Sequence, residues 1–185
     1  SSPTIDVSKD LVHKEGIPVL QLGVESEVTK DSVFQSYPDQ SSIKLMAEAA
    51  NKDVVGEVTV VMEQIKAYEK FLSDFQGNFK GVVKVVRVPS TEKDYRSTAL
   101  KVKENNSPAV LMFVGSEPGS KILNNLNNLG YKPKQLYFDL SLQIELNNYK
   151  KVLGDKSNKT LNNAEGLFYK EKVDSNFVAK YKARF

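Results

Sequence analysis

Short apolar runs alternate with amphipathic stretches along the middle of the chain. The runs have the length of strands, and the run over 108–114 is apolar at nearly every position, as is typical of a central parallel strand covered on both faces. The stretches between the runs repeat apolar residues at helical spacing. This alternation predicts βαβ units, and right-handed crossovers then give an α/β fold with a doubly wound parallel sheet. The predicted strands occupy 57–62, 81–88, 108–114 and 135–140, and the predicted helices occupy 67–76, 94–105 and 119–130.

Less regular segments come before this series. Two short apolar segments, 16–23 and 33–38, predict extended structure. A helix over 39–52 follows, because its apolar residues recur on one helical face, and Asp39 or Ser41 is the predicted N-cap.

The chain becomes polar after the last strand of the series. The asparagine-rich segment 147–166 predicts a surface helix and loop. A strand over 167–173 and a helix over 175–185 are then expected. This last helix carries an apolar stripe made of Phe177, Tyr181 and Phe185.

The ends of the predicted strands are the expected place for a ligand. In doubly wound sheets, ligands bind outside the carboxyl ends of the strands. Four segments lie at or just beyond such ends, and together they form the predicted site. They are Val24 to Ser26, Glu63 to Tyr68, Gly115 to Glu117, and Asp139 to Ser141.

The glycine-rich turn after the central strand does not fit a phosphate loop. Such a loop needs four residues between its glycines, followed by Lys and then Ser or Thr. Here three residues separate Gly115 from Gly119, Ser120 precedes Lys121, and Ile122 stands where a hydroxyl is needed. The dinucleotide fingerprint fails too, because no third glycine follows at its spacing. We therefore do not expect this turn to hold a nucleotide.

Composition narrows the class of protein. With 185 residues, 40% of them hydrophobic, the chain can bury one core or two small lobes. No apolar run is long enough to span a bilayer, and the opening SSPTIDVSKD lacks the pattern of a signal peptide. Cysteine is absent, which excludes disulfides and thiolate chemistry. The net charge is +3 and only three of the 26 basic residues are arginines, so nucleic-acid binding is not expected.

Residues that could support catalysis or bind a metal are scarce. His13 is the single histidine, it lies in a predicted exposed helix, and no GxSxG elbow accompanies it. No HExxH or calcium-loop pattern occurs. Asp94 and Asp139 are distant in sequence, and capping of the following helix explains Asp94. We predict no catalytic residue, no metal and no cofactor.

Tyr68 has two interpretations. It shares an apolar stripe with Phe71 and Phe75, which favours a core residue. It also lies at the start of its helix, facing the strand ends, where its hydroxyl could contact a ligand.

The order of these elements resembles that of the type I periplasmic binding proteins, specifically the Leu/Ile/Val-binding branch of ABC-importer receptors, over nearly the whole chain. GIPVLQLGVESEVT resembles IPVISPGATSPALT of that family, and VFQSYPDQSSIKLMAEAA resembles its phenylalanine-led strand and the first helix of its second lobe. Tyr68 lies where the family has the tyrosine of a Tyr-Gly pair. The segment 90–133 resembles its aspartate–aromatic pair, helix, strand and ligand loop, while NAEGLFYKEKV and FVAKYKARF resemble the return to the first lobe.

The resemblance implies a mechanism without chemistry. Two α/β lobes joined by crossing strands would close on a small solute, such as an amino acid, held by differential affinity for the closed state. Loop N–H and hydroxyl groups would bind the carboxylate of the solute, and Asp139 would bind its ammonium group. Carried over by position, the first-lobe contacts are Val24, Glu25 and Ser26, and the second-lobe contacts are Tyr68, Ser116, Glu117 and Asp139.

The resemblance also divides the chain. Residues 1–37 would be a partial first lobe, 38–171 the second α/β lobe, and 172–185 the return segment to the first lobe. Relative to the family, the first βαβ units and the closing segment of the first lobe are missing, so we expect a fragment. An incomplete lobe would leave a strand edge open, which predicts a homodimer.

The departures from the family pattern lie at the expected ligand contacts. Val24 and Glu25 stand where the family has Ala-Thr, and Glu69 replaces the glycine after the tyrosine. The loop after Gly115 is shorter than in the amino-acid binders and lacks their aromatic residues.

The resemblance finally implies a location and a partner. We expect a periplasmic or extracellular protein that delivers solute to the membrane permease of an ABC importer, with any lipid anchor outside this chain. Two alternatives stay open. One is a ligand-sensing or protein-interaction domain of the same fold that has lost amino-acid binding. The other is an enzyme on a doubly wound sheet, for which nucleophile, metal and phosphate motifs are missing.

Overall fold

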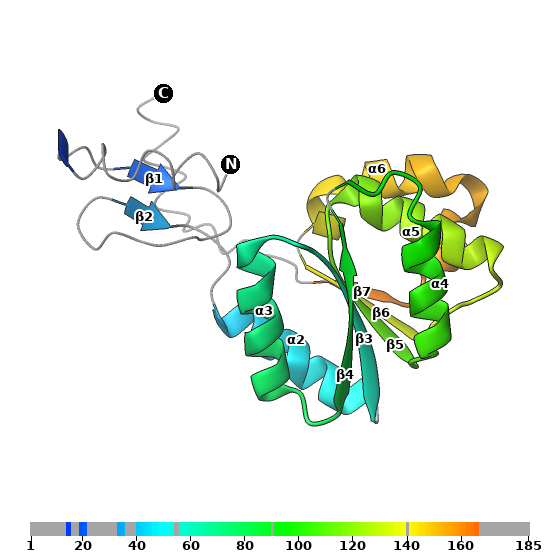
Figure 1. Cartoon of the computed structure of the whole chain (residues 1–185), viewed down its shortest axis with the longest axis horizontal. Helices are drawn as coiled ribbons and strands as arrows, with labels where there is room; N and C mark the ends of the chain where they lie inside the picture. The colour runs from blue at the N-terminus through cyan, green and yellow to red at the C-terminus, as the bar shows by residue number, and fades with distance from the viewer. Residues whose placement is uncertain are drawn as a thin grey trace, which may run out of the picture.

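The computed structural model describes residues 14–15, 19–21, 33–35, 40–53, 56–89, 91–139 and 141–166. The main body is built on a five-stranded sheet in the order β4-β3-β5-β6-β7, and all neighbouring strands are parallel (Figure 1). The predicted fold class, α/β with a doubly wound parallel sheet, is confirmed. The strands are β3 (Glu57–Glu63), β4 (Val82–Val88), β5 (Ala109–Phe113), β6 (Gln135–Phe138) and β7 (Ala164–Gly166).

A separate two-stranded sheet is formed near the start of the chain. Strand β1 (Val19–Gln21) pairs in parallel with β2 (Val33–Gln35), and Val19 lies opposite Val33. Both strands lie within the segments predicted to be extended. The division into lobes at residues 37 and 171 stays a prediction.

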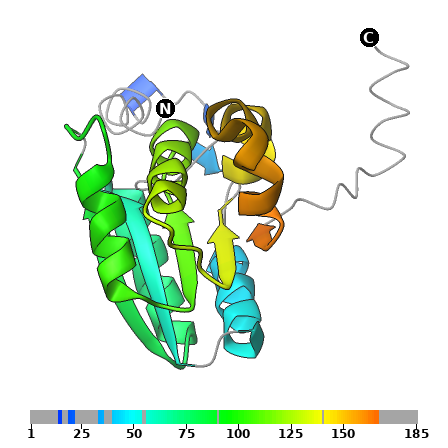
Figure 2. The same cartoon turned by 90° about the vertical axis from the view of Figure 1, so that its right-hand side faces the viewer.

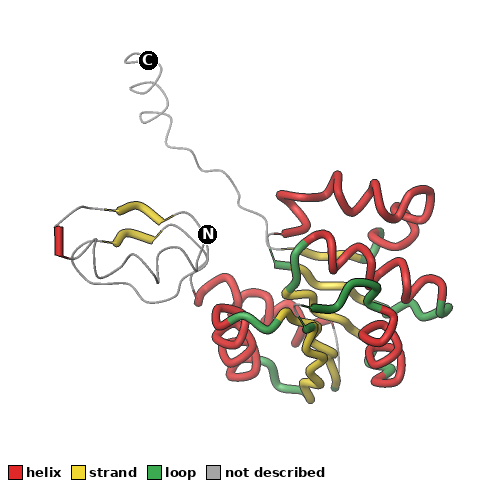
Figure 3. The backbone as a smooth tube through the Cα atoms, turned by 45° about the horizontal axis from the view of Figure 1, so that its top comes forward, coloured by secondary structure: helices red, strands yellow, loops and turns green. Residues whose placement is uncertain are grey.

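Helices cover both faces of the five-stranded sheet. Helices α2 and α3 lie on one face, and α4, α5 and α6 lie on the other (Figures 1 and 2). Figure 3 shows the strands of this sheet, in yellow, between the helices, in red. The helices are α2 (Gln40–Asp53), α3 (Lys66–Asn78), α4 (Arg96–Asn105), α5 (Ser116–Asn128) and α6 (Ser141–Leu153), followed by the short η1 (Gly154–Lys156) and α7 (Ser157–Leu161).

The inner strands contribute to two hydrophobic clusters, one on each face. Successive side chains of a strand point to opposite faces of a sheet. In β5, Leu111 and Phe113 therefore pack against α2 and α3, while Val110 and Met112 pack against α4, α5 and α6. All residues of β5 are buried, which explains why its sequence is an uninterrupted apolar run.

The strand order reverses direction at β3. Strand β4 lies on one side of β3 and β5 on the other. Helix α3, which follows β3, and helix α5, which follows β5, consequently cover opposite faces of the sheet. Such a reversal is the topological switch point, where ligands enter between the carboxyl ends of the two strands. Here the switch point lies between Glu63, at the end of β3, and Gly115, just after β5.

Helix α5 is closed at Gly130. Gly130 has a φ of +68°, a conformation that glycine adopts without steric cost. The N–H of Tyr131 donates to the Leu126 carbonyl, and that of Gly130 donates to the Asn127 carbonyl. These two bonds form the Schellman motif that closes a helix.

The largest differences from the predicted elements are three. Helix α5 begins at Ser116, so the residues just before the predicted helix start at 119 form the first turn of the helix. Helix α6 begins at Ser141, before the predicted surface segment. Strand β7 is formed by residues 164–166, within that polar segment. The strand and helix predicted over 167–173 and 175–185, and His13, lie outside the described residues.

Candidate functional site

One short hydrogen bond joins the ends of β3 and β5 at the switch point. The backbone N–H of Gly115 donates to Oε2 of Glu63, with an N–O distance of 2.6 Å. Gly115 is the N-cap of α5, so its N–H lies at the positive end of the helix dipole. A carboxylate of this chain therefore already lies between the two strand ends.

Two predicted ligand contacts, Ser116 and Glu117, start α5 at this edge. Pro118 fits the first turn of the helix, where its missing N–H costs nothing. Ser116 is 7% exposed, and its hydroxyl accepts a hydrogen bond of 3.5 Å from the Asn148 side chain on α6. The side chain of Glu117 is 74% exposed and pairs with Lys121 at 2.6 Å, which lowers the pKa of the Glu117 carboxyl.

Tyr68 is placed at the same edge, in the first turn of α3, but its ring belongs to the core. It is 8% exposed, and it stacks on Phe113 with ring centroids 5.9 Å apart and an interplanar angle of 15°. A second ring contact joins it to Phe71. Of the two interpretations of Tyr68, the structure supports the core role.

Asp139 directly follows β6, next to the end of β5. It is 7% exposed. Because β5 pairs with β6 through Met112 and Phe138, the residues that follow these strands meet at one edge of the sheet. The structure thus brings Tyr68, Ser116, Glu117 and Asp139 to the carboxyl ends of β3, β5 and β6. The predicted first-lobe contacts Val24, Glu25 and Ser26 lie outside the described residues.

Tyr95, for which no role was predicted, lies beside this edge. Tyr95 is the N-cap of α4 and has a φ of 56°, a left-handed conformation that is uncommon for a tyrosine. Burial raises the pKa of its hydroxyl, while the nearby Lys121 lowers it and Glu117 and Glu63 raise it. Lys121 Nζ lies 5.7 Å from the centre of the Tyr95 ring. Tyr95 is therefore surrounded by the charged groups of the candidate site.

Glu63 was also missed as an individual residue. The segment 63–68 was selected because it follows a strand, but nothing in the sequence showed that a glutamate there would reach the start of another helix. The backbone conformation of Tyr95 has no signal in the sequence at all.

Glu69, which stands where the resembled family has a glycine, forms an ion pair within this chain. Its carboxylate receives two hydrogen bonds of 3.0 Å, from Nε and from a terminal nitrogen of Arg87 on β4. This pairing lowers the pKa of Glu69. Glu69 is therefore directed toward the edge strand β4.

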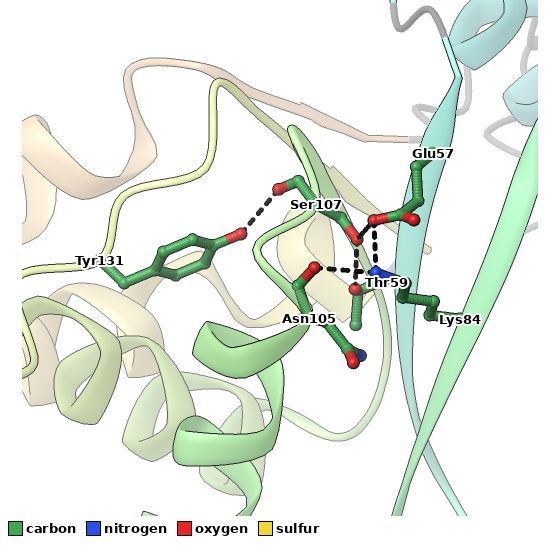
Figure 4. A network of polar contacts seen from close by, with 6 residues as sticks. All are labelled: Glu57, Thr59, Lys84, Asn105, Ser107 and Tyr131. Carbon is green, nitrogen blue, oxygen red and sulfur yellow. Dashed lines mark hydrogen bonds and ion pairs between the residues drawn. The ribbon is translucent and has the colours of Figure 1, made fainter.

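A second polar network lies at the opposite, amino edge of the sheet (Figure 4). Glu57, the first residue of β3, pairs with Lys84 at 2.9 Å and accepts a hydrogen bond of 2.7 Å from the Ser107 hydroxyl. Since Ser107 has one hydroxyl proton, the Thr59 hydroxyl, 2.7 Å away, is the donor to Ser107. Tyr131 donates to the Ser107 carbonyl at 2.6 Å. Every group in this network has a partner, so we assign it to the stability of the fold.

Two hollows on the described surface lie away from the candidate edge. One, of about 280 Å³, lies between α4 and α5, and the other, of about 480 Å³, lies beside β4 and α4. Neither is lined by Tyr68, Ser116, Glu117 or Asp139. The four candidate residues form one wall at the carboxyl edge of the sheet.

The described residues contain neither a group of side chains that could hold a metal ion nor a helix that could span a membrane. Within the described ranges, no group of three or more His, Asp or Glu side chains is arranged to hold a metal ion. Among the same residues, no helix is both long and apolar enough to cross a bilayer.

The sequence matches no protein-family model and no curated protein. Solved structures share its fold. A substrate-binding periplasmic protein from Ralstonia solanacearum matches at a TM-score of 0.69 with 16% identity, over 82% of this chain and 44% of its own. A leucine-binding protein from Thermotoga maritima matches at 0.61 with 18% identity, over 83% and 45%. A solute-binding protein of an ABC transporter from Rhodopseudomonas palustris, in complex with 3,4-dihydroxybenzoic acid, matches at 0.63 with 16% identity, over 96% and 52%.

The chain therefore spans about half the length of these structures. The matched proteins are type I periplasmic binding proteins of ABC transporters, so the predicted resemblance is confirmed for the fold.

Proposed function

We propose that this chain supplies the second lobe of a solute-binding receptor of an ABC importer and performs no catalysis. The observation that carries the proposal is the gathering of Tyr68, Ser116, Glu117 and Asp139 at the carboxyl edge of the sheet. In doubly wound folds this edge is where ligands bind. The similar solved structures support the same activity, since they are solute-binding proteins.

The solute is a small polar molecule, such as an amino acid. Asp139 would bind its ammonium group, because a carboxylate at a strand end with 7% exposure gains strength from a low local dielectric. Ser116 and Glu117 would contact the solute from the first turn of α5. Tyr68 would support this wall through its packing on Phe113.

A first lobe would complete the site. On this proposal Val24, Glu25 and Ser26 contact the solute from residues 1–37, and residues 38–171 form the second lobe. The protein would work outside the cytoplasm, with any signal peptide or lipid anchor beyond these residues, and would pass its solute to a membrane permease.

One observation favours a second candidate function, a sensor or interaction domain of the same fold. Polar groups of the wall are already engaged within the chain, since Glu117 pairs with Lys121 and Glu63 bonds to Gly115. Polar groups that are already paired within the chain contribute less free energy to the binding of a solute. Such a domain would keep the fold and lose amino-acid binding.

A thermal-shift screen tests the proposal. The twenty amino acids, benzoate and 3,4-dihydroxybenzoate are added to this chain and, in parallel, to the longer protein that the proposal requires. A solute at about 100 times its Kd stabilises the protein that binds it by about 2.7 kcal/mol. We expect one solute to stabilise the longer protein and Asp139→Asn to abolish the shift, while the matched control Asp155→Asn, on an exposed 3₁₀ turn, leaves it unchanged. A longer protein that responds to none of these solutes would favour the sensor or interaction domain.

A further inference from the structure

The carboxylate of Glu63 occupies a position that doubly wound folds usually offer to a ligand. The start of a helix at the switch point presents N–H groups and a positive dipole end, which together attract anions. In this chain the Gly115 N–H at that point is taken by Glu63 Oε2 at 2.6 Å. A Cβ built on Gly115 would lie 3.6 Å from the same oxygen, so the carboxylate lies directly alongside the turn.

The pairing of β3 with β5 holds Glu63 close to Gly115. Glu63 is the last residue of β3, and its neighbour Met62 pairs with Phe113, two residues before Gly115. The side chain therefore has to cross only the gap between two adjacent strands. A hydrogen bond from an amide to a charged acceptor is also stronger than one between neutral groups.

The described charges of α5 and of the residue after β6 do not offset the carboxylate. Lys121 is the one basic residue of α5, and it is bound to Glu117 at 2.6 Å. Asp139 adds a further carboxylate at the end of β6. An incoming anion would therefore meet a surface whose one lysine on α5 is already paired.

We infer that Glu63 is a specificity-determining residue, an internal carboxylate that fills the anion-accepting start of α5 and directs the cationic or uncharged end of a solute toward this lobe. The inference rests on the proposed function and names its substrate class, which is solutes that carry an ammonium group or another hydrogen-bond donor. Solutes whose only charge is a carboxylate are disfavoured at this wall.

Titration of benzoate into the chain, followed by NMR at the backbone amides of Gly115, Ser116 and Glu117, tests the inference. Glu63→Gln removes the charge and keeps an acceptor of the same size, so the fold should be preserved. Glu63→Ala removes the acceptor as well and opens the start of α5. The matched control is Glu104→Gln on the exposed face of α4, which changes the net charge by the same amount.

We expect saturable benzoate shifts at these three amides in both Glu63 variants, with a Kd at least about fivefold lower than in the original chain. Fivefold corresponds to about 1 kcal/mol, the order of magnitude for one like charge about 4 Å away in water. Glu104→Gln should behave as the original chain does. Equal benzoate binding in the original chain and the Glu63 variants would overturn the inference, as would the absence of saturable shifts in both variants.

This experiment is independent of solute capture between lobes. It reads amides of the described lobe and needs no first lobe. A failed solute screen with a positive benzoate result would remove the receptor proposal and leave the role of Glu63 at α5. A successful screen with a negative benzoate result would do the reverse.

Discussion

Gly119 lies beneath the side chain of Tyr149, where α5 and α6 pack against each other. A Cβ built at this glycine would collide with the Tyr149 hydroxyl and lie 3.1 Å from both Tyr149 Cζ and Val114 Cγ2. Tyr149 is fully buried and also contacts the ring of Phe138, so it has little room to move. The absence of a side chain at Gly119 therefore sets the distance between the two helices.

Gly119→Ala should destabilise the protein. Alanine is better than glycine in a helix by about 1 kcal/mol, but overpacking of a dense core costs about 1–3 kcal/mol. Because the obstructing ring is fully buried, we expect the overpacking to dominate and the free energy of unfolding to fall by about 1–2 kcal/mol. Urea unfolding followed by circular dichroism measures this difference.

Gly77 in α3 supplies the control. A Cβ built there meets nothing within 4 Å, so Gly77→Ala should raise stability by about 0.5–1 kcal/mol through helix propensity alone. The double variant Gly119→Ala with Tyr149→Phe should recover part of the loss, since the hydroxyl is the closest obstacle. A stabilising Gly119→Ala would show that α6 shifts freely and that the close contact is not a constraint.

Individual side chains of the site were only partly predictable. Ser116, Glu117 and Asp139 could be placed at the edge because they follow apolar strands, and the strands of a parallel sheet all end at one edge. The hydrogen bond from Gly115 to Glu63 could not be predicted, since it depends on which strands are neighbours and on a side-chain rotamer. The ion pair between Glu69 and Arg87 joins residues on α3 and β4, and it too becomes visible only in three dimensions.

At the scale of elements, the amino ends of β3 and β5 are joined by the network around Ser107. Ser107 and Thr59 are both buried, and the hydroxyl of Ser107 links Thr59 to Glu57. Buried polar groups that lose their partners cost about 1–3 kcal/mol each. Substitutions in this network are therefore expected to lower the free energy of unfolding.

Ser107→Ala should lower the free energy of unfolding by about 1–3 kcal/mol, because the buried Thr59 hydroxyl loses its acceptor. The control is Ser97→Ala, where an exposed hydroxyl donates to Glu92 and where we expect a change within about 0.5 kcal/mol. Both values come from denaturant unfolding at neutral pH. Equal effects of the two variants would mean that water replaces the lost partner at Ser107.

The same network makes stability depend on pH. The hydrogen bond from Lys84, followed by that from Ser107, lowers the pKa of Glu57 below its ordinary value of 4.5. A carboxylate with a lowered pKa in the folded state stabilises the fold above the pKa of the unfolded chain, and this contribution is lost as the pH falls through the folded pKa. We expect the free energy of unfolding of Lys84→Met to fall less steeply below pH 4.5 than that of the original chain. Parallel slopes in unfolding experiments over this pH range would contradict the role of Glu57.

The pattern of elements was predictable where periodicity was strong. The segments 57–62, 81–88 and 108–114 became β3, β4 and β5 with shifts of one residue at their ends. The strand β7 was missed because its residues, Ala164 to Gly166, carry no β-branched or aromatic side chain. It is a strand because β6 offers a free edge to it, with Leu136 opposite Ala164. The start of α5 was placed too late because glycine and proline usually mark a loop.

At the scale of the whole molecule, the described residues form a hydrophobic cluster on each face of the five-stranded sheet. Among the described residues, the members of both clusters lie between Ile43 and Ala164. We expect the segment 40–166 alone to unfold cooperatively, with the far-ultraviolet circular dichroism of an α/β protein. A broad transition, or exposed apolar surface that binds a fluorescent dye, would show that residues outside this segment complete the core.

The two polar connections between β3 and β5 also bear on how these strands find their alignment. Their middle residues are apolar on both faces, so sliding one strand past the other by one position would exchange one buried side chain for another instead of exposing it to water. Hydrophobicity alone thus discriminates poorly between the correct pairing and a shifted one. The bond of Ser107 with Glu57 and that of Gly115 with Glu63 stand at opposite ends of the pair, and a one-residue slip would break both. These two hydrogen bonds therefore favour the observed register of β3 and β5 over a shifted one.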